Sequence, residues 1–314
     1  MGVASPHRAE RAPLVTLALD ESRLEHRWLS VGDVNLHCVF AGDDKGPLVV
    51  LLHGFPELWY AWRRQILALA DAGFRVVAPD MRGYNLSDKP AAVSAYAIDI
   101  LARDIDGLIR ACGREKAHVV GHDWGGGVAW AFAMKHPTRL DRLVILNCPH
   151  PLSMFRGLRR PDQLKRSWYM FFFQLPRIPE RSMRANHFAM LLGVLRNDPL
   201  VPGAFDERDL SVYAEAYAQP GALRGMTNYY RAMFRSKPST KTIARIDAPV
   251  LVIWGEQDRH LGLPLSCPDS ALVPNVRVER IADASHWVQH ERPERVNELL
   301  IDFLGASGRA NTEA

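Results

Sequence analysis

The sequence predicts an α/β protein with a mostly parallel central sheet, helices on both faces, and a helical insertion between two of the strands. Six short apolar segments alternate with helical patterns, at 48–54, 74–80, 117–123, 143–147, 249–255 and 276–281. The best of them are apolar on both faces, which is typical of buried parallel strands. The alternation stops at about residue 150 and resumes at Ile246, which indicates the insertion.

The remaining segments complete this organisation. Residues 24–40 alternate around Gly32-Asp33 and predict an antiparallel hairpin. A stripe of apolar residues from Leu101 to Cys112 predicts a helix. Between about 150 and 240 no strand-like segment occurs, while aromatic residues, arginine and proline become dense. We therefore expect four parts, in chain order: a first core part (1–149), a helical insertion (150–240), a second core part (241–304) and a disordered tail (305–314).

Composition excludes several classes of function. The chain has 314 residues, of which 47% are hydrophobic and 24% charged, enough for a large core. The net charge is +4, and the basic residues are mixed with acidic ones, which argues against nucleic-acid binding. No CxxC pair, metal cluster or phosphate-binding glycine pattern occurs, so we expect no metal and no cofactor. Without a membrane-spanning run or a signal peptide, the chain is expected to be cytoplasmic.

A turn rich in small residues carries the first candidate for catalysis. The segment 117–120 leads into Gly121-His122-Asp123-Trp124-Gly125-Gly126, and a helical pattern follows. This arrangement resembles the nucleophile elbow of α/β hydrolases, Gly-x-Ser-x-Gly, with Asp123 at the serine position. A carboxylate is ionised at pH 7 and can attack a saturated carbon without a base, forming an ester of the enzyme. The plainer alternative is that Asp123 only caps the helix.

The other triad members should follow later strands, because the chain order in this fold is nucleophile, acid, histidine. His286 follows the last predicted strand and is the candidate base. Asn147, after one candidate strand, cannot be an anion, so Asp258 is the expected acid, with Glu256 as the alternative. Asp258 would orient the imidazole and stabilise its protonated form. Four other histidines compete with His286 for the role of base: His53, His122, His150 and His290.

Two backbone groups are expected to form an oxyanion hole. Phe55 follows the strand at 48–54, and Trp124 follows the nucleophile directly. Their N–H groups should converge on the carboxyl oxygen of Asp123 and stabilise the oxyanion of ester hydrolysis. Each such donor typically contributes roughly 2.7–4 kcal/mol at the transition state.

Together these motifs resemble those of the soluble epoxide hydrolases of the α/β-hydrolase superfamily. The resemblance spans roughly residues 24–304 and rests on HGFPELWYAWR (53–63), DMRGYNLSDKP (80–90), GHDWGG (121–126), WYMFFFQLP (168–176), NYYR (228–231) and ASHW (284–287). It implies that the helical insertion is a cap over the active site, where two tyrosines hold the epoxide oxygen. By motif these are Tyr169 and Tyr230, and the alternatives within the insertion are Tyr229, Tyr213 and Tyr217.

The resemblance also implies the reaction. A small apolar epoxide and water would give a vicinal diol, a reaction that suits detoxification, and a homodimer is left open. A phenol can bind the epoxide oxygen and protonate it as the ring opens, because an alkoxide is far more basic than a phenolate.

Three other hypotheses remain. Haloalkane dehalogenases share Asp123 and Trp124 but need N–H donors for the halide. The side chain of Phe55 offers none, although Trp168 keeps the idea open, and some of these enzymes take their acid at the position of Asn147. Haloacetate dehalogenases resemble the chain at HGFPE but have an arginine after the nucleophile. A non-catalytic binding module would be expected to lack triad members. An esterase is disfavoured by Asp123 itself.

Overall fold

The computed structural model describes residues 19–236 and 243–305. These ranges contain an eight-stranded sheet in the order β1-β2-β4-β3-β5-β6-β7-β8. Its strands are β1 (Glu25–Val31), β2 (Val34–Ala41), β3 (Leu48–Leu52), β4 (Arg75–Pro79), β5 (Ala117–His122), β6 (Leu140–Leu146), β7 (Val250–Gly255) and β8 (Val276–Ile281). β1 and β2 form the predicted hairpin, β2 pairs antiparallel with β4, and all other pairs are parallel. The predicted α/β class with a mostly parallel sheet is confirmed.

The apolar runs explain the centre of this sheet. Every residue of β3, β4, β5 and β7 is buried, so these strands are covered on both faces. β8 lies at the edge and is largely half-exposed. Parallel strands in the centre bring their carboxyl ends to one edge of the sheet, which is where sites form in such folds.

Helices of the core pack on the sheet in two pairs. α2 packs against α3, and α1 packs against α11. The bounds are α1 (Ile66–Asp71), α2 (Ile98–Ala111), α3 (Trp124–Lys135), α10 (Val288–Glu291) and α11 (Pro293–Gly305). Short 3-10 helices occur at Glu21–Arg23, Trp59–Trp62, Val93–Tyr96, Pro137–Arg139 and Leu263–Leu265. In α2 the predicted stripe is buried, including Leu101, Ile105 and Leu108.

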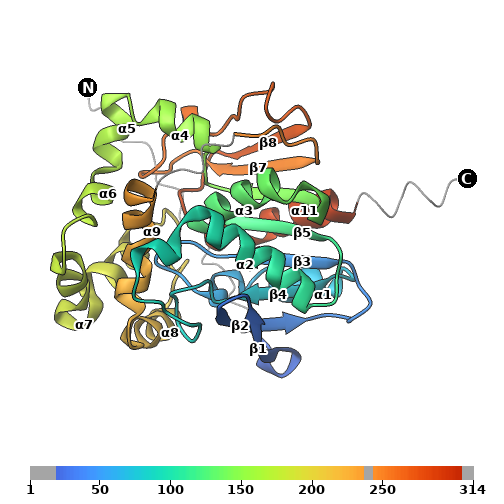
Figure 1. Cartoon of the computed structure of the whole chain (residues 1–314), viewed down its shortest axis with the longest axis horizontal. Coiled ribbons are helices and arrows are strands. Elements are labelled where there is room, and N and C mark those ends of the chain that lie inside the picture. The colour runs from blue at the N-terminus through green and yellow to red at the C-terminus, as the bar shows by residue number, and fades with distance from the viewer. Residues whose placement is uncertain (1–18, 237–242, 306–314) are drawn as a thin grey trace, which may run out of the picture.

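Among the described residues between β6 and β7 there are six helices, in the region of the predicted helical insertion. They are α4 (Pro151–Gly157), α5 (Pro161–Arg166), α6 (Trp168–Phe172), α7 (Ile178–Asn197), α8 (Glu207–Ala218) and α9 (Ala222–Arg235). Figure 1 shows α6, α7, α8 and α9 gathered along one side of the sheet. The predicted end of the insertion at residue 240 and residues 306–314 of the predicted tail lie outside the described residues.

Neither 19–236 nor 243–305 contains a helix that is long and apolar enough to cross a membrane. Within the same ranges, no three histidine, cysteine or acidic side chains are grouped so that they could hold a metal ion.

Candidate active site

Asp123 lies in a sharp turn between β5 and α3. Its φ of 49° and ψ of −120° are outside the ordinary regions for a residue with a side chain, and such strain concentrates at functional sites. The surrounding glycines are required by close packing. A Cβ on Gly125 would lie 2.1 Å from the carbonyl oxygen of Leu52, and one on Gly54 would lie 2.4 Å from the Cβ of Asp123. The small residues of the motif therefore let the turn approach β3.

The three predicted triad members meet at the carboxyl edge of the sheet. Nε2 of His286 lies 3.6 Å from Oδ2 of Asp123, and Nδ1 of His286 lies 2.7 Å from Oδ2 of Asp258. Asp123 directly follows β5, Asp258 lies in the loop after β7, and His286 lies in the loop after β8. Such a geometry would suit a nucleophile, a base and an orienting acid, the roles predicted for these residues from the sequence.

Asp258 is held by a set of donors that includes a residue that sequence reasoning set aside. Its Oδ1 accepts the backbone N–H groups of His260 at 2.7 Å and Leu261 at 2.8 Å. Its Oδ2 accepts a hydrogen bond from Nδ2 of Asn147 at 2.8 Å, and Oδ1 of Asn147 accepts the N–H of Gly255 at 2.9 Å. The side chain of Asn147 thus links the Asp258 carboxylate to the backbone of Gly255. Among the described residues no hydrogen bond joins the alternative acid, Glu256, to His286.

Charge couples these groups strongly. Burial would raise the pKa of Asp258, but the charge of His286 and its hydrogen bond outweigh burial and lower that pKa to about 2. Burial would lower the pKa of His286, but the charge and hydrogen bond of Asp258, with the charge of Asp123, raise it to about 9. At neutral pH the imidazole is therefore protonated and lies between two carboxylates.

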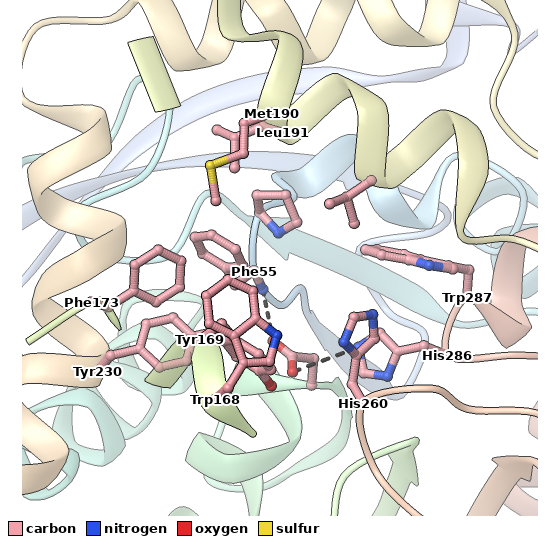
Figure 2. Close-up of a pocket in the computed structure, with 13 residues that line it drawn as sticks. Phe55, Trp168, Tyr169, Phe173, Met190, Leu191, Tyr230, His260, His286 and Trp287 are labelled. Atoms are coloured by element: carbon pink, nitrogen blue, oxygen red, sulfur yellow. Dashed lines mark hydrogen bonds and ion pairs between the residues drawn. The ribbon is translucent and has the colours of Figure 1, made fainter. Parts of the chain in front are cut away.

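A cavity of about 150 Å³ opens beside Asp123. Helices α6, α7 and α9 of the insertion and the loops after β3, β5, β7 and β8 contribute its walls. The lining residues are Phe55, Pro56, Asp123, Trp168, Tyr169, Phe173, Met190, Leu191, Val194, Tyr230, His260, His286 and Trp287. Figure 2 shows Phe55, Phe173, Tyr169, Tyr230 and His286 around this space. The cavity is mostly apolar and aromatic, which suits a small apolar molecule.

Tyr169 and Tyr230 both line the cavity, with ring centroids 5.9 Å apart. Burial, together with the charge of Asp123, raises the pKa of each of the two phenols well above the ordinary value of a tyrosine. Both hydroxyls therefore stay protonated at neutral pH and are available as hydrogen-bond donors.

The alternative tyrosines do not line this cavity. The hydroxyl of Tyr229 donates to the carbonyl oxygen of Arg82 at 2.8 Å, and that of Tyr213 donates to Oε1 of Glu57 at 3.0 Å. Tyr217 is fully buried away from the cavity. The geometry thus favours the pair chosen from the sequence motifs.

Only one of the two predicted oxyanion donors contacts Asp123. The N–H of Phe55 donates to Oδ1 of Asp123 at 2.8 Å. The helix that starts at Trp124 makes no capping hydrogen bond to the Asp123 side chain, which is turned toward Phe55 and His286 instead. The indole of Trp124 packs edge-on against Tyr230, with ring centroids 5.1 Å apart. A role for the Trp124 N–H during ester hydrolysis stays a prediction.

The other histidines have partners away from Asp123. His122 and His290 both pair with the buried carboxylate of Glu57, at 3.1 Å and 2.7 Å. Nε2 of His53 accepts the N–H of Met81, and Nδ1 of His150 accepts the N–H of Leu152. One further histidine, His260, does line the cavity, and nothing in its local sequence singled it out.

Comparisons with known proteins agree with this fold. A model of the α/β hydrolase fold matches residues 47–293. The AB hydrolase superfamily protein YfhM of Bacillus subtilis is 45% identical over 284 residues, which cover 88% of this chain and 97% of that protein. Epoxide hydrolase 1 of Caenorhabditis elegans is 38% identical over 290 residues, covering 89% of this chain and 70% of that protein.

Solved structures lead to the same group. A mutant of an epoxide hydrolase from Bacillus megaterium has a TM-score of 0.82 at 34% identity, covering 89% of this chain and 100% of that chain. Epoxide hydrolase A from Mycobacterium thermoresistibile has a TM-score of 0.79 at 34% identity, covering 90% and 98%. The chain therefore belongs to the α/β hydrolase fold family and, within that family, to the epoxide hydrolases.

Proposed function

We propose that this protein converts a small apolar epoxide and water to a vicinal diol through an ester on Asp123. One observation carries the proposal: a carboxylate, rather than a serine, lies in the elbow, 3.6 Å from His286, and borders an apolar cavity shared with two tyrosines. Relatives named epoxide hydrolases, 34–38% identical to this chain over most of its length, support it.

In the first step a carboxylate oxygen of Asp123 attacks one ring carbon of the epoxide. The carbon–oxygen bond of the ring breaks, and Tyr169 or Tyr230 gives its proton to the departing oxygen, which becomes a hydroxyl group. An alkyl ester of Asp123 and a phenolate result. No base is needed, because the nucleophile is ionised from the start.

In the second step His286 takes a proton from water, and the resulting hydroxide attacks the ester carbonyl carbon of Asp123. The N–H of Phe55 would stabilise the developing oxyanion. Collapse breaks the bond between the acyl carbon and the diol oxygen. The leaving oxygen takes the proton of the carboxylic acid that forms, so the carboxylate of Asp123 returns and His286 is again protonated. Before this second step, the protonated imidazole of the resting enzyme can give its proton to the phenolate left by the first step. His286 is then neutral and can act as the base.

This scheme predicts a change in the basicity of His286. Esterification removes the negative charge of Asp123, which is one of the charges that raise the pKa of His286 to about 9. Asp123→Asn removes the same charge and should lower the pKa of His286, as followed by the ring proton signals in an NMR titration. Asp162→Asn, which changes an exposed aspartate paired with Arg160, is the control and should leave it unchanged. An unshifted pKa in Asp123→Asn would contradict the coupling.

A second prediction concerns the two phenols. Tyr169→Phe and Tyr230→Phe should each slow ester formation yet leave activity, because the remaining phenol still donates. The double variant should lose about 10²–10⁴-fold, the usual contribution of a general acid. Rapid-quench kinetics of ester formation measures this. Tyr229→Phe is the matched control, since its hydroxyl donates to Arg82, away from the cavity. Near wild-type ester formation by the double variant would refute the assignment.

Dehalogenation of a haloalkane or of haloacetate is the alternative reaction for an aspartate nucleophile. The side chain of Phe55 offers a halide no N–H donor, and Trp124 offers a carboxylate no cation. Side-by-side turnover of styrene oxide, a fatty-acid epoxide, a haloalkane and haloacetate tests the proposal directly. Turnover of the halides alone would overturn it. A cytoplasmic location, a homodimer and a role in detoxification stay predictions.

A further inference from the structure

Asp198 connects the helical insertion to the core through two residues that pack against His286. It ends α7, so it belongs to the insertion. Its Oδ2 accepts the Nε2–H of His260 at 2.9 Å and the Nε1–H of Trp287 at 2.9 Å. Both partners are core residues: His260 follows β7 and Trp287 follows β8. Oδ1 lies 3.7 Å from the exposed guanidinium of Arg259.

The two partners of Asp198 are two of the three rings that pack against His286, the third being that of His122. The centroid of the His260 ring lies 5.3 Å from that of His286 at an interplanar angle of 75°, and the centroid of Trp287 lies 5.2 Å away at 90°. Figure 2 shows His260, His286 and Trp287 together at one end of the cavity. One carboxylate of the insertion therefore holds two of the rings against which the imidazole of His286 packs.

The hydrogen bonds from His260 and Trp287 to Asp198 are strong because their acceptor is ionised. Burial would raise the pKa of Asp198, but the hydrogen bond and charge of His260 and the hydrogen bond of Trp287 outweigh burial, and the pKa lies below its usual value. The carboxylate is thus ionised at neutral pH, and hydrogen bonds to an ionised acceptor are roughly twice as strong as neutral ones. Such partners can hold a ring in one orientation.

We infer that Asp198 is a positioning residue that holds His260 and Trp287 against His286 and thereby aligns the base for the hydrolysis of the Asp123 ester. The inference rests on the proposed two-step reaction. Because ester formation needs no base, Asp198 acts on the second step only. A bond that merely joined the insertion to the core would disturb both steps, since Tyr169 and Tyr230 are also carried by the insertion.

The first test is Asp198→Asn, which keeps the shape but removes the charge and offers only one acceptor oxygen. Single-turnover kinetics should show ester formation at the wild-type rate and ester hydrolysis slowed about 10- to 100-fold, the effect of a small misplacement of a reacting group. Asp162→Asn is the matched control, an exposed aspartate of the insertion, and should perform both steps normally.

The pH profile of hydrolysis gives a second readout. The titratable groups that face His286 are Asp123, Asp198, Asp258, His122 and His260. Asp198 contributes to the raised pKa of His286. Loss of the Asp198 charge should therefore lower the pKa of His286. Hydrolysis fails at low pH because His286 is then protonated and cannot act as a base, so this acid limb of the pH profile should move to lower pH. A purely structural role would not shift this limb.

Trp287→Phe keeps an aromatic ring beside His286 and the charge of Asp198, but it removes the Nε1–H donor to Asp198. It therefore tests the inference even where Asp198→Asn does not fold. It should slow hydrolysis by less than Asp198→Asn does, and the two changes together should be less than additive, because they break the same bond. Normal hydrolysis in either variant, or equal slowing of both steps, would overturn the inference. Failure of the wild-type protein to form any ester would instead overturn the proposed function.

Discussion

Replacement of His286 by glutamine is expected to stop the reaction halfway. Asp123 should still attack the epoxide, because a carboxylate needs no base, but water is no longer activated and the ester accumulates. Turnover should fall by about 10²–10⁴-fold or more, the range for loss of a general base. Intact-mass spectrometry after mixing His286→Gln with styrene oxide should show the protein plus one substrate mass, and peptide mapping should place the added mass on Asp123.

A matched control separates this result from a general disturbance. His136→Gln changes a histidine that stacks on Phe132 at the end of α3 and does not line the cavity. It should turn over normally and carry no adduct. An inactive His286→Gln that forms no adduct would argue for direct hydration of the epoxide, with His286 as the base in a single step.

The fold could be predicted because its central strands are mostly apolar and buried. The segments at β3 and β7 are apolar throughout, and that at β5 is apolar or small except for His118 and His122. Each is followed by small or polar residues at the carboxyl end. Since parallel strands end at one edge, the side chains that follow them were expected to meet, and Asp123, Asp258 and His286 do meet there. Local pattern and chain order were sufficient to predict that these three side chains lie close together; their catalytic roles stay a prediction.

Other parts of the site depend on contacts between distant segments. Asn147 was set aside because an amide cannot be the acid, yet its side chain holds Asp258 from the neighbouring strand end. Asp198 and His260 are 62 positions apart and carry no motif, and only the packing of the insertion on the core joins them. The orientation of the Asp123 side chain, away from the first turn of α3, also depends on Phe55 and His286 rather than on the elbow motif.

The origin of the diol oxygen tests the whole scheme. If Asp123 attacks the ring carbon, the oxygen added to the first diol comes from its carboxylate, and the solvent oxygen stays on the aspartate after hydrolysis. With the protein in excess over epoxide in ¹⁸O-labelled water, a single turnover should give mostly unlabelled diol and a labelled Asp123. Mass spectrometry of the diol and of the peptide that contains Asp123 measures both.

Repeated turnovers provide the internal control for that experiment. Each cycle replaces a carboxylate oxygen of Asp123 by one from water, so label should enter the diol progressively as cycles accumulate. Direct attack of water activated by His286 would give fully labelled diol from the first turnover and leave Asp123 unlabelled. In that case Asp123, 3.6 Å from Nε2 of His286, would only orient the base and stabilise its charge, and the ester mechanism would be wrong. Membership of the chain in its family would stand unchanged, since it rests on the fold and the relatives rather than on the nucleophile.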